Sequence, residues 1–254
     1  MAFPKSLLAF VFLIAGMLPI KPANSAELLA VGTEFAHVFE RSPSGQFFGL
    51  GVDILNAMAK MTGDTIKFEI YPWSRAQWMV ENGQAHILIG PYKTPDREAR
   101  FSFAQRAFYR DFMMFYTRVG AEFNWNGDYA FLVGKKIGVV NGWVYGDQFE
   151  KMRGTMKLEV AHSLTSALKM LSAHRVDVLA SNVRNTEVLV KSLGPKYEYV
   201  AVEPAIATLD GYLAFCKQVN CELVRKLFDE AFERLRESGE LAKMGRKHNV
   251  RMPP

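Results

Sequence analysis

The chain has 254 residues, of which 49% are hydrophobic and 22% are charged, a balance that excludes a disordered protein. Its formal net charge is +5, but no long run of Lys or Arg accompanies it, so we expect no nucleic-acid partner. The sequence also lacks the spacings typical of a metal site or a phosphate-binding glycine loop, and we expect neither a metal nor a cofactor.

The first 26 residues have the order of a secretory signal peptide. Lys5 is followed by an apolar run at 7–20 and by small residues at 23–26, with cleavage expected after Ser25 or Ala26. The alternative is an uncleaved anchor, although a bilayer span needs about 20 apolar residues. No Cys lies near the cleavage region, so we expect a protein secreted to the periplasm without a lipid anchor.

Strand and helix patterns alternate along the rest of the chain. Apolar periodicity and Gly or Asn breakers predict helices at 52–61, 74–81, 144–152, 164–172, 183–193 and 222–237, followed by a last short helix after Gly239. Short apolar runs predict strands at 28–31, 65–71, 87–89, 112–117, 136–140, 157–161, 176–180, 197–202 and 212–215. Repeated strand–helix units predict an α/β fold with a mostly parallel sheet flanked by helices.

The two cysteines, Cys216 and Cys221, are five positions apart in a chain that is expected to be exported. This favours one structural disulfide, which would contribute roughly 2 kcal/mol because it closes a short loop. A metal or redox site is the alternative, but neither a nearby His nor a redox spacing supports it.

Four segments carry a resemblance to a known family. They are 49–55 (GLGVDIL), 94–103 (TPDREARFSF), 134–142 (GKKIGVVNG) and 235–247, and they occur in order over nearly all of the chain after the signal peptide. Together they resemble the family 3 bacterial extracellular solute-binding proteins, the amino-acid-binding components of ABC transporters.

The resemblance implies a type II periplasmic binding protein fold with two lobes joined by a two-strand hinge. One lobe would contain residues 27–115 and 208–254, and the other would contain residues 116–207. The lobes would close around a small polar ligand that carries a carboxylate, an amino acid or a relative, at the carboxyl ends of parallel strands. A monomer would then deliver this ligand to a membrane ABC permease.

Arg97 is the first candidate ligand-binding residue. It stands in a Thr-x-x-Arg pattern with Thr94 at the start of a helical turn, and the resemblance implies that it grips a ligand carboxylate. A guanidinium suits this role because its planar fork binds a carboxylate with two hydrogen bonds. The alternative is an ion pair with Asp96 or Glu98.

Gly142, Trp143, Val144 and Tyr145 precede a helix, where the resemblance implies backbone donors for the same carboxylate. Related proteins usually carry small hydroxyl residues here. Trp143 and Val144 depart from that pattern and offer no hydroxyl, and Trp143 would alternatively pack in the core.

Asn182 is a second departure, at a position where amino-acid binders carry an Asp that pairs with the ligand ammonium. An Asn accepts a hydrogen bond but brings no charge, and it would alternatively serve as a helix N-cap. We therefore consider Glu34 as a partial replacement for the missing charge.

Aromatic and glycine residues at strand ends are candidates for the walls of the cleft, since ligand pockets are mostly apolar and aromatic. Any of the aromatic residues would alternatively belong to the core. These candidates are Phe35, Phe39, Trp73, Gly90 and Tyr92.

Two rival functions use the same scaffold. A periplasmic enzyme similar to cyclohexadienyl dehydratases would need an acid or base, for which Glu34 and His37 are the conceivable residues, but no spacing supports them. A ligand sensor for a membrane receptor would share the same cleft. We expect a transport receptor rather than an enzyme.

Overall fold

The computed structural model describes residues 26–194 and 198–254. Apart from Ala26, the predicted signal peptide lies outside these residues, as does Tyr197 of a predicted strand. No helix within the described ranges is long and apolar enough to cross a bilayer.

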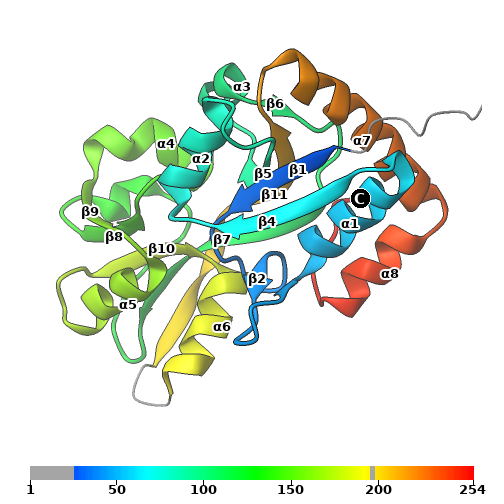
Figure 1. Ribbon diagram of the computed structural model, residues 1–254. Helices are drawn as coiled ribbons and strands as arrows, with labels where there is room; N and C mark the ends of the chain where they lie inside the picture. The colour runs from blue at the N-terminus through cyan, green and yellow to red at the C-terminus, as the bar shows by residue number, and fades with distance from the viewer. Residues whose placement is uncertain (1–25, 195–197) are drawn as a thin grey trace, which may run out of the picture.

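One nine-stranded sheet runs through the molecule, in the order β4-β1-β5-β11-β7-β10-β8-β9, with β6 paired to β11 (Figure 1). Its strands are β1 (Glu27–Gly32), β4 (Thr65–Ile70), β5 (Ile87–Tyr92), β6 (Ser102–Phe103), β7 (Tyr109–Arg118), β8 (Lys136–Val140), β9 (Lys157–Ala161), β10 (Val178–Asn182) and β11 (Tyr199–Phe215). A separate hairpin consists of β2 (Glu40–Arg41) and β3 (Phe47–Phe48).

Helices cover the faces of this sheet at both of its ends (Figure 1). They are α1 (Leu50–Thr62), α2 (Trp73–Glu81), α3 (Pro95–Arg100), α4 (Asp147–Met152), α5 (Leu164–Ser172), α6 (Val183–Leu193), α7 (Val219–Glu237) and α8 (Glu240–Lys247). Two 3₁₀ turns are η1 (Tyr129–Leu132), which precedes β8, and η2 (Arg153–Thr155), which follows α4.

Parallel strand pairs lie at both ends of the sheet, and antiparallel pairs lie in its centre. β1 is parallel to β4 and β5, and β8 is parallel to β9 and β10. The long strands β7 and β11 pair with each other and connect these two groups, because β11 also pairs with β5 and β7 with β10. The sheet is therefore mixed, and its two parallel parts are continuous with each other.

The strands predicted at 197–202 and 212–215 belong to the single strand β11, so the prediction of two separate strands is wrong. β11 continues through a register shift between Val202 and Ala207, where its pairing with β7 is interrupted and then resumes. Pro204 lies within this irregular stretch, where a missing backbone donor does not break a ladder bond.

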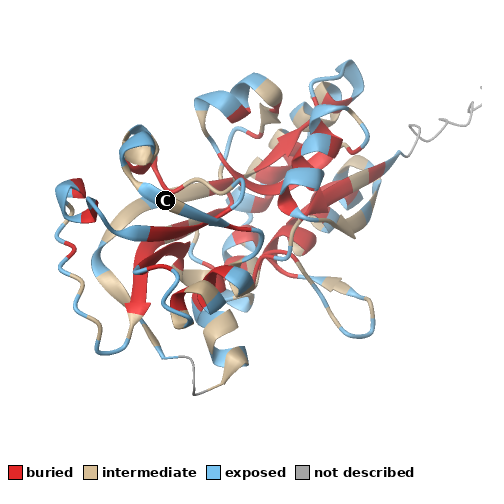
Figure 2. Cartoon of the chain, turned by 90° about the vertical axis from the view of Figure 1, so that its left-hand side faces the viewer, coloured by how far each residue is buried: buried red, intermediate tan, exposed pale blue. Residues whose placement is uncertain are grey.

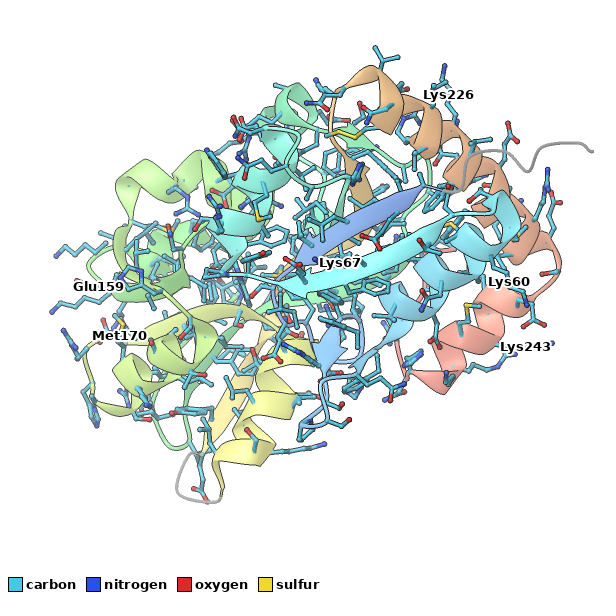
Figure 3. All side chains as sticks on the ribbon, viewed as in Figure 1. Lys60, Lys67, Glu159, Met170, Lys226 and Lys243 are labelled. Atoms are coloured by element: carbon cyan, nitrogen blue, oxygen red, sulfur yellow. A yellow bond between two sulfur atoms is a disulfide. The ribbon has the colours of Figure 1, made fainter. Side chains whose placement is uncertain are left out.

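The core lies on the inner strands and under the helices (Figure 2). Every residue of β5 and β10 is buried, as expected for parallel strands covered on both faces. The outermost strands β4 and β9 instead expose charged residues, including Lys67 and Glu159, while Lys60 and Lys226 point outward from α1 and α7 (Figure 3). Charges on the outer strands protect the sheet from pairing with another chain.

Local sequence signals explain most of the helix ends. Gly63 ends α1 in a left-handed conformation with φ 85°, and the side chains of Thr94, Ser163 and Asn182 cap α3, α5 and α6. The helix predicted from residue 144 begins only at Asp147.

The late start of α4 has a local cause. Gly146 adopts φ 105°, which a right-handed helix does not allow, and the backbone amide of Tyr145 donates to the carboxylate of Glu150 in the helix. The segment before Gly146 is therefore a loop.

The predicted disulfide is confirmed. Cys216 follows β11, Cys221 lies in the first turn of α7, and their Cα atoms are 5.6 Å apart. Both residues are buried, so the bond fastens α7 to the end of the central strand.

Candidate functional site

Two neighbouring cavities lie where loops from the two ends of the sheet meet. The outer cavity has a volume of about 580 Å³, and the inner cavity about 10 Å³, which is room for at most one water molecule. Trp73 and Trp143 border both of them and separate one from the other.

Eight of the predicted ligand-binding residues border the inner cavity: Phe35, Trp73, Gly90, Tyr92, Arg97, Trp143, Val144 and Asn182. The outer cavity is bordered by Glu34 and by polar residues that the sequence reasoning missed, among them Glu40, Ser163, Thr165 and Asn185. Gly142 contacts Arg97 from outside the inner cavity, whereas Tyr145 borders neither cavity.

Arg97 lies at the bottom of this region and is only 4% exposed. Thr94 caps the helix that carries it, because its hydroxyl accepts from the backbone amide of Arg97 at 3.3 Å. Its guanidinium donates to the carbonyl of Tyr92 through Nη1 and to the carbonyl of Gly142 through Nη2, each at 2.9 Å. It therefore contacts elements from both ends of the sheet.

Neither acidic neighbour of Arg97 in sequence pairs with it. Asp96 pairs with Arg100 at 3.2 Å and Glu98 with Lys93 at 3.9 Å, so the alternative that Arg97 pairs with one of these two carboxylates is wrong. Among the described residues, no carboxylate forms an ion pair with Arg97.

The charge of Arg97 is consequently uncompensated. Burial, with a smaller contribution from the like charge of Arg100, lowers the pKa of the Arg97 guanidinium to about 10. The group stays protonated at neutral pH, and a buried positive charge without a counter-ion favours binding of an anion.

Gly142 offers an acceptor to Arg97 through its carbonyl, and the role expected of the backbone N–H groups in this loop stays a prediction. Its carbonyl accepts hydrogen bonds from Arg97 and from Nε1 of Trp73, the latter at 3.1 Å. Because α4 begins at Asp147, the loop around Gly142 is not the head of a helix.

Trp143 is half-buried between the two cavities, so it is neither a fully buried core residue nor an exposed one. Tyr145 is instead fully buried, its hydroxyl accepts from the backbone amide of Val140 at 2.7 Å, and its ring packs on Phe149. The prediction that Tyr145 faces the ligand is therefore wrong, since its polar atom is used inside the core.

Asn182 ends β10 and borders the inner cavity, with 1% of its surface exposed. Its Oδ1 accepts the backbone N–H of Asn185 at 2.9 Å, which confirms the N-cap interpretation. The side chain occupies the border between the cavity and the start of α6.

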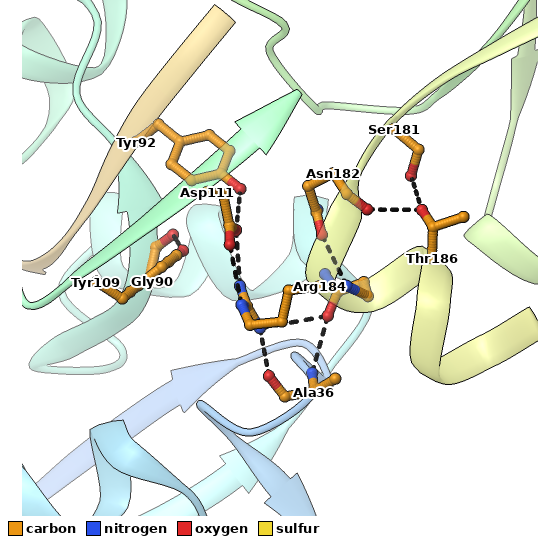
Figure 4. A network of polar contacts seen from close by, with 10 residues as sticks. Ala36, Gly90, Tyr92, Tyr109, Asp111, Ser181, Asn182, Arg184 and Thr186 are labelled. Carbon is orange, nitrogen blue, oxygen red and sulfur yellow. Dashed lines mark hydrogen bonds and ion pairs between the residues drawn. The ribbon is translucent and has the colours of Figure 1, made fainter. Parts of the chain in front are cut away.

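A buried polar network surrounds the same helix start (Figure 4). Arg184 of α6 donates through Nε and Nη2 to the two carboxylate oxygens of Asp111 on β7, at 3.0 and 2.7 Å. Tyr92 also donates to Asp111, at 2.7 Å, and Arg184 donates to the carbonyl of Ala36. The sequence reasoning missed this network, although Asp111 directly precedes the apolar strand predicted at 112–117.

Burial lowers the pKa of Arg184, but the charge and hydrogen bonds of Asp111 outweigh this, so the pKa lies above the ordinary value. Burial and the charge of Asp111 likewise raise the pKa of Tyr92 well above its ordinary value. The phenol is therefore neutral at physiological pH and acts as a donor to Asp111.

Further contacts join the same elements. The backbone amide of Ala36 donates to Oδ1 of Asn185 at 2.8 Å, and Nδ2 of Asn185 is buried without a partner among residues 26–194 and 198–254. Phe35 packs edge-to-face on Trp73 at 5.6 Å, whereas Phe39 is wholly buried against Phe47 and belongs to the core. Phe39 is thus not a wall of either cavity.

Glu34 and His37, the two residues considered for acid–base chemistry, border different cavities. Glu34 is exposed at the outer cavity, and no contact within the described part of the chain engages its carboxylate. His37 borders a third cavity of about 240 Å³ beside Asp111 and Arg184. No cluster of His, Cys, Asp and Glu in residues 26–194 and 198–254 is arranged to hold a metal.

Comparisons with known proteins agree with this architecture. The model of the bacterial extracellular solute-binding proteins, family 3, matches residues 29–250. A probable histidine-binding protein of Neisseria gonorrhoeae is 26% identical over 223 residues, which are 87% of this chain and 81% of that protein.

Solved structures show the fold. A histidine kinase sensor domain with similarity to periplasmic binding proteins has a TM-score of 0.78 at 16% identity, covering 91% of this chain and 98% of that domain. A second structure is the substrate-binding protein of an ABC uptake transporter from Streptococcus pneumoniae with bound histidine. It has a TM-score of 0.73 at 16% identity, covering 87% of this chain and 91% of that protein. The predicted α/β fold of type II is confirmed by these likenesses.

Proposed function

Because the chain belongs to the bacterial extracellular solute-binding proteins of family 3, we propose that it is a periplasmic receptor that closes around a small carboxylate and presents it to an ABC permease. In this proposal residues 1–26 are a cleaved signal peptide and the mature protein is a monomer.

The proposed lobes are residues 27–115 with 208–254, and residues 116–207. β7 and β11 support this division because they are the two long strands that connect the parallel parts of the sheet. The proposed boundaries fall within these strands, and β11 has its register shift between Val202 and Ala207. Bending at this interruption would separate the lobes without breaking either parallel part.

The unpaired charge of Arg97 is the observation that carries the proposal. The guanidinium is buried, borders the inner cavity and donates only to neutral carbonyls. A ligand carboxylate would replace the Gly142 carbonyl on Arg97, and charge-assisted hydrogen bonds of this type contribute roughly 1.5–3 kcal/mol against about 1 kcal/mol for neutral ones.

The remainder of the ligand would occupy the outer cavity. Its volume of about 580 Å³ lies in the range of small-molecule sites, and residues from both proposed lobes border it. Trp73 and Trp143 would form the apolar walls, and Glu34 would face a donor or a cationic group at the far end of the ligand.

Calorimetry and thermal-shift measurements with a broad panel of amino acids and other small carboxylates test this function. Arg97→Ala should weaken binding of every carboxylate ligand by roughly 100-fold, since it removes a buried charge-assisted contact. Arg75→Ala is the matched control, because Arg75 lies exposed on α2 and borders neither cavity. Unchanged affinity in Arg97→Ala, or no binding by well-folded protein, would contradict the proposal.

Two further experiments address the rest of the proposal. Incubation with prephenate or arogenate, followed by product analysis, should show no turnover, and turnover would identify an enzyme instead. Mass spectrometry of protein exported by its native host should find a chain that begins after Ser25 or Ala26.

A further inference from the structure

We propose that the ligand is a carboxylate whose adjacent carbon carries an oxygen, as in a 2-oxo or 2-hydroxy acid, and not an ammonium group. This inference rests on the proposed function and names its ligand class. It follows from the hydrogen-bonding groups that remain available around the inner cavity.

Asn182 presents a donor to the inner cavity. A backbone amide is only a donor, so the side-chain atom that binds the N–H of Asn185 must be the carbonyl oxygen Oδ1. The capping contact therefore fixes the orientation of the amide and leaves Nδ2 for the cavity. Among the described residues nothing accepts a hydrogen bond from this Nδ2. This proposal therefore replaces the sequence-based expectation that Asn182 accepts from the ligand with donation from Nδ2.

The second polar group at the inner cavity is also a donor. A guanidinium has five N–H groups, and Arg97 uses one on the carbonyl of Tyr92 and one on the carbonyl of Gly142. The oxygens of an incoming carboxylate would thus accept from Arg97. Asn182 borders the same small cavity.

Two of the carbonyls that border this cavity already accept hydrogen bonds. The carbonyl of Gly90 accepts from the Tyr109 hydroxyl at 2.6 Å, and the carbonyl of Tyr92 accepts from Arg97. The hydroxyl of Tyr92 donates to Asp111, and no carboxylate of the described residues borders the cavity.

The carboxylate of Asp111 is not available as an acceptor for a ligand ammonium. Arg184 binds both of its oxygens and Tyr92 binds one of them, and the side chain is 2% exposed. An ammonium beside the ligand carboxylate would therefore meet a donor and the positive charge of Arg97, with no carboxylate to pair with. An oxygen at the same atom would accept from Nδ2 of Asn182.

Asn185, at the outer cavity, resembles Asn182 in how its side-chain amide is bound. Its Oδ1 accepts from the backbone amide of Ala36, and its buried Nδ2 has no partner in the described structure. The start of α6 thus carries two side-chain amides whose oxygens are used by backbone N–H groups, and both residues border the cleft cavities.

The test uses the mature full-length protein and triplets of ligands that differ only at the second carbon. Each triplet contains the 2-oxo, 2-hydroxy and 2-amino acid with the same side chain, for example methyl, isobutyl, benzyl and carboxyethyl. Calorimetry should give at least tenfold tighter binding of the 2-oxo or 2-hydroxy acid than of the 2-amino acid in the best-bound triplet.

Asn182→Asp sharpens the test. Aspartate caps a helix as well as asparagine does, so the variant keeps the acceptor for Asn185 and should fold normally. Because it replaces the free donor with a charged acceptor, it should move the preference at least tenfold toward the 2-amino acid. Circular dichroism and the melting temperature check its fold.

A wild-type preference for the 2-amino acid, or a preference that Asn182→Asp does not move, would overturn the inference. A ligand from the broad panel that lies outside this class would overturn the inference alone and leave the receptor function standing. Failure of every compound to bind well-folded protein would overturn both.

Discussion

Arg97 and Arg184 are both buried guanidinium groups, but they have different partners. Arg184 binds the carboxylate of Asp111 with two hydrogen bonds, which compensates its charge inside the protein. Arg97 meets only neutral carbonyls, and desolvation accordingly lowers its pKa. The partner of each group therefore decides its role, so that Arg184 stabilises the fold and Arg97 is left to bind an anion.

His86 provides a residue-scale prediction about pH. Its Nδ1 accepts the backbone amide of Leu29 at 3.0 Å, and burial lowers its pKa below the ordinary 6.5. The unfolded chain then binds a proton more readily than the folded one, so this contribution to stability is complete above pH 6.5 and is lost as the pH falls through the folded-state pKa.

His86→Asn should reduce the loss of melting temperature between about pH 7.5 and about pH 5, because Asn supplies an acceptor for Leu29 that does not titrate. Differential scanning fluorimetry of both proteins across this range measures the effect. Equal pH dependence in the two proteins would contradict the assigned role.

At the scale of elements, the ends of helices and strands position the site. The junction of β10 and α6 directs Asn182 and Asn185 toward the cleft, because each amide oxygen satisfies a backbone N–H. The loop between β8 and α4 directs the Gly142 carbonyl at Arg97, because Gly146 delays the start of the helix. Short connections thus determine which polar atoms face the ligand.

The disulfide is an element-scale stabiliser, since it fastens the first turn of α7 to the end of β11. Replacing both Cys216 and Cys221 with Ala should lower the free energy of unfolding by about 2 kcal/mol, as expected for a short loop. Urea unfolding measures this change. Ligand affinity should be unaltered, because neither cysteine borders a cavity at the cleft. Unaltered stability would show that the bond does not constrain the unfolded chain.

At the scale of the whole molecule, several polar contacts within the described residues connect the proposed lobes besides the strands β7 and β11. The Gly142 carbonyl accepts from Arg97 and Trp73, Asn185 accepts from Ala36, and Arg184 binds Asp111. The first contact would be exchanged for the ligand carboxylate. The contacts made by α6 do not occupy the position proposed for the ligand. They would therefore stabilise the closed arrangement with or without ligand.

The pair of Asp111 and Arg184 yields a prediction at this scale. Asp111→Asn should lower the free energy of unfolding by roughly 3 kcal/mol, because it leaves the buried Arg184 charge without a carboxylate. Urea unfolding measures the effect, and adding Arg184→Met to the same protein should restore part of the loss.

Asp210→Asn is the matched control. Asp210 also forms a two-bond pair with an arginine, Arg110, but both side chains are more than a quarter exposed. Exposed pairs contribute about 1 kcal/mol or less. Equal losses in Asp111→Asn and Asp210→Asn would contradict a special role for the buried pair.

The sequence by itself determined the α/β class, most of the helices and strands and the disulfide, and it offered the N-cap of α6 as one of two alternatives for Asn182. These features depend on apolar periodicity and on residues close together in the chain, so local patterns carry them. The resemblance carried by the Thr94–Arg97 segment also led to an arginine that borders a cavity. The lobe boundaries and the ligand contacts remain predictions.

Only the tertiary structure decided which polar atoms are free. The partners of Gly142, Tyr145 and Asp111 come from other elements, and the atom of Asn182 that faces the cavity depends on how the chain turns into α6. A hydrogen bond uses an atom in a particular direction, and that direction is set by the packing of distant segments. The sequence therefore gives the hydrogen-bond donors and acceptors of each residue. The fold determines which of them remain free to bind a ligand.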